Sequence, residues 1–211
     1  MYRLAVALAL SVLVNLTGCG KQESGSPTAG GTAGSATVMA QSLAQGLSEM
    51  VFRPPQPGER ILGGRFRHPE SGYAIRPPIG WTRTTAPGSA SLPVRDRAVF
   101  RDPKTGDFLD VGIMRGGPAA ITPASLTALK DDLTRGFRTT RQGKLIASDI
   151  FRFRRFAAVQ TLVNRQGTIL LQLLVFRKPG EFLQIAFGIH QSRYHAISRR
   201  VEASIASLEW P

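Results

Sequence analysis

The fold of this chain is decided by residues 145–189, which read LIASDIFRFRRFAAVQTLVNRQGTILLQLLVFRKPGEFLQIAFGI. Runs rich in Val, Leu, Ile and Phe alternate here with Asn-Arg-Gln-Gly and Lys-Pro-Gly, which are typical turn sequences. The pattern predicts an antiparallel meander of four strands, at residues 145–154, 156–164, 168–176 and 181–189. The central two are rich in Val, Leu and Ile, so we expect them to be interior strands buried on both faces.

Two β-hairpins are predicted before this meander. Each pairs two strand-like segments across a turn: residues 65–68 with 73–76, and residues 98–101 with 108–114. A loop that contains Pro and Gly, residues 83–96, separates the hairpins, and we expect it to be mobile. Trp81 follows a Pro-Gly turn and is expected to anchor its strand in the core.

Helical periodicity appears on either side of the meander. Thr122 and Pro123 form a favourable helix start, and apolar residues follow at helical spacing: Leu126, Leu129, Leu133 and Phe137. A closing helix is predicted at about residues 192–208. The expected fold class is therefore α+β: one domain at residues 60–211, in which helices pack on the faces of an antiparallel sheet.

The N-terminus has the features of an export signal. Arg3 precedes the apolar run 4–14, which is too short to span a bilayer, and Leu16-Thr17-Gly18-Cys19 resembles the bacterial lipobox. We expect residues 1–18 to be a lipoprotein signal peptide and Cys19 to be lipid-modified. The alternative is an ordinary signal peptide with an incidental cysteine. Export would place the protein on a bacterial membrane, with inner and outer membrane both open.

Residues 19–59 are expected to link the lipid to the domain. Residues 20–38 are mostly Gly, Ser, Thr and Ala, and a flexible coil of this length spans roughly 24 Å. A short amphipathic helix is predicted at residues 39–50, where Met39, Leu43, Leu47 and Met50 recur. Cys19 is the only cysteine, so the domain has no intrachain disulfide and no thiolate metal cluster.

The chain is strongly basic, with 27 Lys and Arg against 14 Asp and Glu. An exported basic domain suits anionic lipid headgroups or an acidic protein partner, whereas nucleic acid is not expected outside the cytosol. Alternating Phe151, Arg152, Phe153 and Arg154 predict a strand with phenylalanines on one face and arginines on the other. The candidate anion-binding residues are Arg152, Arg154, Arg155, Arg177 and Lys178. The alternative is a solvated sheet face with flanking positive charge.

Metal binding and catalysis have weaker signals. Asp102, Asp107 and Asp110 flank one turn and form a candidate calcium site, although their spacing is not that of a calcium loop and Asp is common in turns. His68, His190 and His195 lack metal-ligand spacing. The sequence contains no G-x-S-x-G elbow, no phosphate-binding loop and no dinucleotide fingerprint. No other cofactor and no enzymatic activity are expected.

Residues 72–81, GYAIRPPIGW, resemble the G-Y-x-hydrophobic-x-x-P-x-G-W opening of PsbP-like domains. Residues 99–102 are similar to the V-F-x-D of that family, and residues 109–113 and 203–208 resemble its next strand and its closing segment. The resemblance covers most of residues 64–210. It implies an α/β/α sandwich around an antiparallel sheet, a fold shared with lipoproteins of the DcrB type and Ran-binding proteins of the Mog type.

PsbP is an extrinsic subunit of photosystem II, and cyanobacterial homologues are lipid-anchored on the lumenal side of the thylakoid. The resemblance therefore implies a non-catalytic accessory or assembly subunit of a membrane protein complex, with photosystem II as one candidate. A periplasmic location is the alternative to the thylakoid lumen. The segment 152–156 is more basic than expected for such a subunit. The second hypothesis is an envelope lipoprotein that binds anionic lipid or a small ligand through this basic surface.

Overall fold

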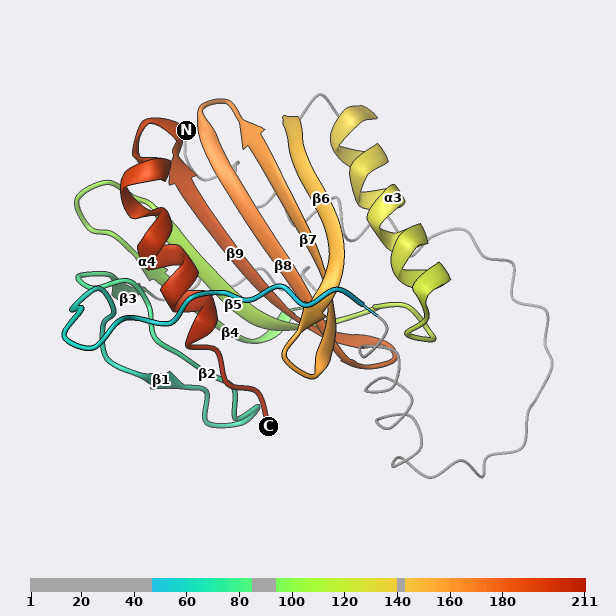
Figure 1. Ribbon diagram of the computed structural model, residues 1–211, viewed down its shortest axis with the longest axis horizontal. Helices are drawn as coiled ribbons and strands as arrows, with labels where there is room; N and C mark the ends of the chain where they lie inside the picture. Colours follow the sequence, from blue (N-terminus) through green and yellow to red (C-terminus); the bar gives the residue numbers. More distant parts are fainter. Residues whose placement is uncertain (1–46, 85–93, 140–142) are drawn as a thin grey trace.

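The computed structural model describes residues 47–84, 94–139 and 143–211. These residues form a seven-stranded antiparallel sheet with the strand order β3-β4-β5-β9-β8-β7-β6 (Figure 1). The strands are β3 (Thr82–Thr84), β4 (Val94–Arg101), β5 (Phe108–Arg115), β6 (Lys144–Phe153), β7 (Phe156–Arg165), β8 (Thr168–Lys178) and β9 (Glu181–His190).

The predicted meander is confirmed, because β6, β7, β8 and β9 pair in chain order. The predicted interior strands, β7 and β8, each have a hydrogen-bonded neighbour on both sides, which confirms the prediction. Strand β9 is an interior strand as well. Strand β9 pairs with β5 on its far side, with Val111 opposite Ile185, so β8 and β9 lie at the centre of the sheet and residues 182–189 are all buried. The turn between β7 and β8 suits tight reversal, since Gln166 and Gly167 have φ of 48° and 81°.

Both predicted hairpins are present. Strands β1 (Phe66–Arg67) and β2 (Ala74–Ile75) pair as a separate two-stranded sheet, while β4 and β5 join the main sheet. The predicted loop 83–96 is shorter at both ends, because β3 continues to Thr84 and β4 begins at Val94. The expected mobility concerns mainly residues 85–93, which lie outside the described residues.

Two helices lie on opposite faces of the sheet, as the α+β prediction requires. Helix α3 (Pro123–Thr139) begins where predicted, and the Thr122 hydroxyl accepts a hydrogen bond from the Ser125 amide at 3.1 Å. Helix α4 (Tyr194–Ala206) follows a short 3₁₀ helix, η2 (Gln191–Arg193).

The alternation of side chains along each strand divides the interior into two cores. On β8, Leu173 and Val175 belong to the larger core, which Ile197, Val201 and Ile205 of α4 cover. The intervening Leu174 and Phe176 belong to the smaller core, which contains Leu126 and Leu133 of α3. Trp81 lies in the larger core with its ring 6.3 Å from that of Phe187, which confirms its predicted anchoring role.

The N-terminal arm, residues 47–59, is extended and crosses from β6 towards α4 (Figure 1). The Arg152 amide donates to the Ser48 carbonyl at 2.9 Å, and the Met50 amide donates to the Arg152 carbonyl at 3.0 Å. The predicted helix 39–50 is therefore wrong over residues 47–50, and its first part lies outside the described residues. The edge of β6 supplies backbone partners in place of helical ones, and the sheet partly buries Leu47 and Met50.

The arm contributes to both cores. Leu47 packs against the smaller core, whereas Met50 and Phe52 pack against the larger one, where the Phe52 ring lies 5.6 Å from that of Phe153. All described elements lie within residues 47–211, so a chain that begins after Cys19 retains the whole of the described fold. The predicted signal peptide, Cys19 and residues 20–38 lie outside the described residues.

Candidate anion-binding groove

The turn between β6 and β7 carries two of the predicted cations. Strand β6 ends at Phe153 and β7 begins at Phe156, so Arg154 and Arg155 form a two-residue turn, with Arg154 at φ 55°. The predicted strand thus ends one residue early, and Arg154 does not alternate with Phe153 on a strand face. Phe153 and Phe156 pair directly and stay buried, and this arrangement leaves both guanidinium groups exposed.

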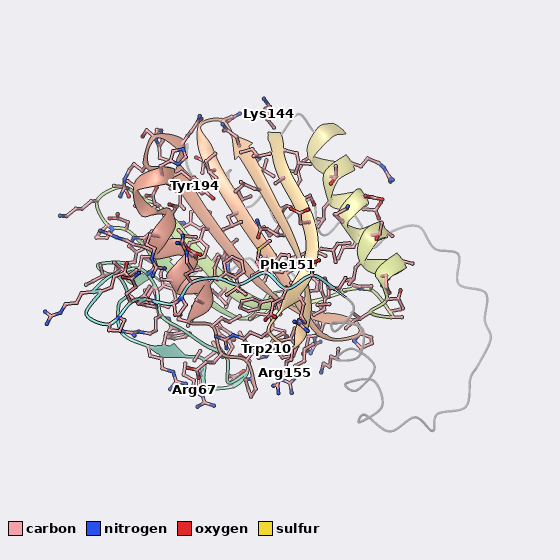
Figure 2. All side chains as sticks on the ribbon, in the orientation of Figure 1. Arg67, Lys144, Phe151, Arg155, Tyr194 and Trp210 are labelled. Atoms are coloured by element: carbon pink, nitrogen blue, oxygen red, sulfur yellow. The ribbon has the colours of Figure 1, made fainter. Side chains whose placement is uncertain are left out.

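A groove of about 370 Å³ lies beside this turn. Three distant segments line it: the β6–β7 turn, the β1–β2 hairpin through Arg67, and the C-terminal segment through Trp210. Figure 2 shows Arg67, Arg155 and Trp210 at the same end of the molecule. The C-terminal segment reaches this place because Ala74 and Glu209 exchange two backbone hydrogen bonds, each of 2.8 Å.

Aromatic rings and backbone carbonyl groups position the groove arginines. The Arg155 guanidinium lies 5.0 Å from the centre of the Phe156 ring, and its Nη2 donates to the Trp210 carbonyl at 3.4 Å. Arg154 donates from Nη2 to the Ala206 carbonyl at 2.7 Å. Behind the groove, the Arg177 guanidinium lies 5.7 Å from the centre of the buried Trp210 ring. These contacts orient the cations without neutralising them.

No carboxylate in the described part of the chain lies within ion-pair distance of Arg67, Arg154, Arg155 or Arg177. Among the described residues, Glu209 is the only lining residue with an acidic side chain, and it pairs with Arg65; the C-terminal residue, Pro211, also lines the groove. A concave surface that holds uncompensated positive charge attracts anions, because the surrounding protein focuses the electric field into it.

The structure brings together three of the five predicted anion-binding residues: Arg154, Arg155 and Arg177. The other two have carboxylate partners. Arg152 Nη2 lies 2.6 Å from the Glu49 carboxylate on the arm, and Lys178 Nζ lies 3.4 Å from that of Glu181. Sequence reasoning missed Arg67 and Trp210, and no local pattern links either of them to the β6–β7 turn.

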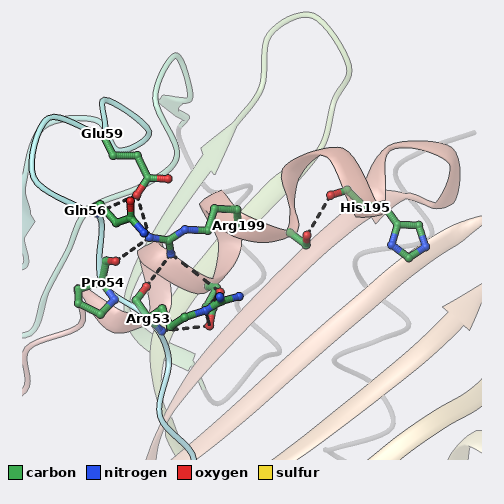
Figure 3. A network of polar contacts seen from close by, with 8 residues as sticks. Arg53, Pro54, Gln56, Glu59, His195 and Arg199 are labelled. Atoms are coloured by element: carbon green, nitrogen blue, oxygen red, sulfur yellow. Dashed lines mark hydrogen bonds and ion pairs between the residues drawn. The ribbon is translucent and has the colours of Figure 1, made fainter.

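A second cluster, of two arginines and two glutamates, fixes the N-terminal arm to α4 (Figure 3). We call it the arm clamp, and it consists of Arg53, Glu59, Arg199 and Glu202. Arg199 donates to the carbonyl groups of Arg53 and Pro54 at 2.8 and 2.6 Å and to the Glu59 carboxylate at 2.8 Å. The amide and Nε of Arg53 donate to Glu202 Oε1 at 3.0 and 3.1 Å.

The clamp also affects the titration of Glu202. Burial alone would raise the pKa of this carboxyl group, but hydrogen bonds from Arg53 and the positive charges of Arg53 and Arg199 lower the pKa below its ordinary value. Glu202 therefore stays ionised to a lower pH than an unperturbed glutamate.

Each of the three aspartates of the predicted calcium site has an arginine partner, which Asp102 and Asp107 share. Asp107 and Asp102 lie 2.6 and 3.3 Å from the guanidinium nitrogens of Arg193, whereas Asp110 lies 2.6 Å from that of Arg97. Burial would raise the pKa of Asp102, but hydrogen bonds from Lys104, Thr105 and Arg193 lower it. Within residues 47–84, 94–139 and 143–211, no three His, Cys, Asp or Glu side chains gather to hold a metal ion.

Among the helices that the structure describes, none is both long and apolar enough to cross a bilayer.

The described architecture defines the class: an α+β sandwich in which two helices cover opposite faces of an antiparallel sheet. The solution structure of cyanobacterial PsbP (CyanoP) from Synechocystis sp. PCC 6803 is similar, with a TM-score of 0.54 and 16% sequence identity. The match covers 72% of this chain and 94% of CyanoP. The chain therefore has a PsbP-like fold, which confirms the fold implied by the sequence resemblance.

Other comparisons are weaker. A crystal structure from Bacteroides thetaiotaomicron VPI-5482 matches with a TM-score of 0.41 and 12% identity, over 71% of this chain and 48% of that chain. No protein-family model matches this sequence, and no curated protein matches it.

Proposed function

We propose that this protein is a non-catalytic, lipid-anchored accessory or assembly subunit of a membrane protein complex. The observation that carries the proposal is the PsbP-like fold, which spans 94% of the CyanoP chain. Photosystem II is the first complex to test if the source organism has photosynthetic reaction centres. The corresponding location is the lumenal side of the thylakoid, and otherwise the periplasmic face of a bacterial membrane.

The proposed attachment is through Cys19. Lipid attachment to the Cys19 thiol would precede the removal of residues 1–18, and each methylene buried in the bilayer stabilises the attachment by about 0.8 kcal/mol. Residues 20–38 would then form a flexible tether with a root-mean-square length of roughly 24 Å. A protein held in this way meets membrane complexes by diffusion in two dimensions and needs only modest affinity for them.

The chemistry of the groove supports a binding role. Its guanidinium groups stay protonated at physiological pH and donate hydrogen bonds, so they recognise anions but do not act as general bases. The carboxylate of Glu209 is paired with Arg65. We therefore assign the groove to recognition and no part of it to catalysis.

The test is a crosslinked pull-down of the full-length protein from native membranes, with Cys19→Ala as the control. We expect the subunits of one membrane complex to be enriched together with the anchored protein and to be lost with the Cys19→Ala variant. If neither form enriches a membrane complex, the accessory-subunit proposal is wrong. Equal enrichment by both forms would contradict the role of the anchor.

A further inference from the structure

We propose that the groove binds the phosphate of an anionic phospholipid headgroup and thereby orients the domain on the membrane that anchors it. The inference that the phosphate belongs to a membrane lipid rests on the proposed anchor at Cys19. The inference that the groove binds a phosphate rests on the groove alone. The residues that would hold the phosphate are Arg67, Arg154 and Arg155, with Arg177 as a further source of positive charge.

The origin of the donors on separate segments of the chain favours phosphate over carboxylate. A planar carboxylate is satisfied by one guanidinium fork, whereas a tetrahedral phosphate accepts hydrogen bonds from donors on several sides. Arg67 and the Arg154–Arg155 turn reach the groove from separate segments of the chain. Donors that approach one space from separate segments match a phosphate better than a single carboxylate side chain.

The groove also has a suitable size and free charge. Its volume of about 370 Å³ lies at the lower end of the range for small-ligand sites. Unlike the arm-clamp arginines, the three proposed phosphate ligands have no carboxylate partner among the described residues. A phosphate would therefore compensate positive charge without first displacing an internal ion pair.

The position of the arm favours a membrane source for this phosphate. Glu49 forms a parallel bridge with Arg152, which lies two residues before the β6–β7 turn. The described chain thus begins about four strand residues, or roughly 13 Å, from Arg154. The tether to Cys19 would therefore join the domain on the strand that leads into the groove turn, and a tethered domain can turn this end towards the bilayer.

The experiment measures the co-sedimentation of the chain from residue 20 onward with two kinds of vesicle. One kind contains phosphatidylcholine alone, and the other contains phosphatidylcholine and phosphatidylglycerol. We expect binding to the anionic vesicles, and a loss of roughly 100-fold in the variant with Arg67→Gln, Arg154→Gln and Arg155→Gln, since each arginine near an anionic surface contributes about fivefold. Circular dichroism and thermal unfolding of each variant verify that it is folded.

A matched variant removes the same charge away from the groove, through Arg60→Gln, Arg101→Gln and Arg200→Gln. We expect it to keep most of the vesicle binding. Equal losses in both variants would overturn the groove site, because they would show that only total charge matters. If the unsubstituted chain does not bind anionic vesicles, the proposal that the ligand is a membrane phospholipid is wrong.

Two soluble probes distinguish the source and the chemistry of the ligand. If glycerol 3-phosphate competes with the anionic vesicles, the result supports phosphate recognition. If the protein binds glycerol 3-phosphate but no vesicles, the ligand is a free phosphate ester. Competition by polyglutamate but not by glycerol 3-phosphate would overturn the phosphate assignment in favour of an acidic protein segment. If the protein enriches a membrane complex in the pull-down but does not bind vesicles, only this inference is refuted. If it binds anionic vesicles but enriches no membrane complex, only the accessory-subunit role is refuted.

Discussion

In the arm clamp, Arg199 donates hydrogen bonds to two carbonyl groups and to the carboxylate of Glu59. In the groove, Arg155 donates to one carbonyl group and lies over the ring of Phe156. Both sets of contacts fix the position of a guanidinium group, but only the contacts of Arg199 include a carboxylate that compensates its charge. A high arginine content therefore has two uses in this molecule: the clamp holds the chain to itself, and the groove keeps positive charge available for a ligand.

This difference separates stability from binding. Substitution of a clamp arginine leaves an acidic partner without its counter-charge and releases the arm, so we expect it to reduce the free energy of unfolding. Substitution of an exposed groove arginine leaves no carboxylate behind, so we expect it to change ligand affinity alone. The four predictions below test this division, in order of decreasing effect on stability.

Trp210→Ala tests whether Trp210, a buried residue that lines the groove, stabilises the fold. Trp210 is 7% exposed, and its ring lies 5.7 Å from that of Phe156, so its removal opens a cavity in the larger core. We expect the free energy of unfolding to fall by about 3–5 kcal/mol in urea titrations. Trp210→Phe, which keeps much of the apolar volume, should cost less than half as much. A loss below about 1 kcal/mol would show that this side chain lies outside the core.

Arg199→Ala tests the arm clamp. It removes hydrogen bonds to Arg53, Pro54 and Glu59, and we expect the free energy of unfolding to fall by about 1–3 kcal/mol. The control is Arg200→Ala on the same helix, which should change it by no more than about 0.5 kcal/mol. Equal effects of the two substitutions would contradict a structural role for Arg199.

Acidification should loosen the arm without affecting the groove arginines. Because the folded-state pKa of Glu202 is lowered, its stabilising contribution is complete above its ordinary pKa of 4.5 and is lost as the pH falls through the lower folded value. The Arg53 amide, which donates to Glu202, should then lose protection from hydrogen exchange. In Glu202→Gln this protection should not vary over the same pH range. Undiminished protection in the unsubstituted protein at acidic pH would show that ionisation of Glu202 does not hold the arm.

Arg154→Gln and Arg155→Gln should have the smallest effect on stability. Both side chains are exposed, so we expect each substitution to change the free energy of unfolding by no more than about 0.5 kcal/mol. Arg199→Gln provides the contrast, since the shorter amide cannot replace the three hydrogen bonds of the guanidinium group. If either groove substitution costs more than about 1 kcal/mol, that arginine belongs with the structural ones.

The sequence predicted the meander well because strand periodicity and turn chemistry are local properties. It did not predict that β5 would pair beside β9, nor that the edge of β6 would hold residues 48–50 in an extended form. Both outcomes depend on tertiary contacts. The β6–β7 turn was assigned partly to a strand because it contains no Gly, Asn or Asp, and Arg154 adopts a positive φ without such a signal.

The candidate site was predicted only in part, for the same reason. Arg154, Arg155 and Arg177 lie close together in the meander, so their clustering could be inferred from strand order. Arg67 and Trp210 join them through the pairing of Ala74 with Glu209, a contact between segments 135 residues apart for which the sequence provides no local signal.

The most direct test of the two classes of arginine is an NMR titration of their Nε–Hε signals with short-chain phosphatidylglycerol, in the chain from residue 20 onward. The account predicts that the signals of Arg67, Arg154 and Arg155 shift together, while those of Arg53 and Arg199 stay in place. Shifts spread equally over both groups, or confined to the arm clamp, would contradict it.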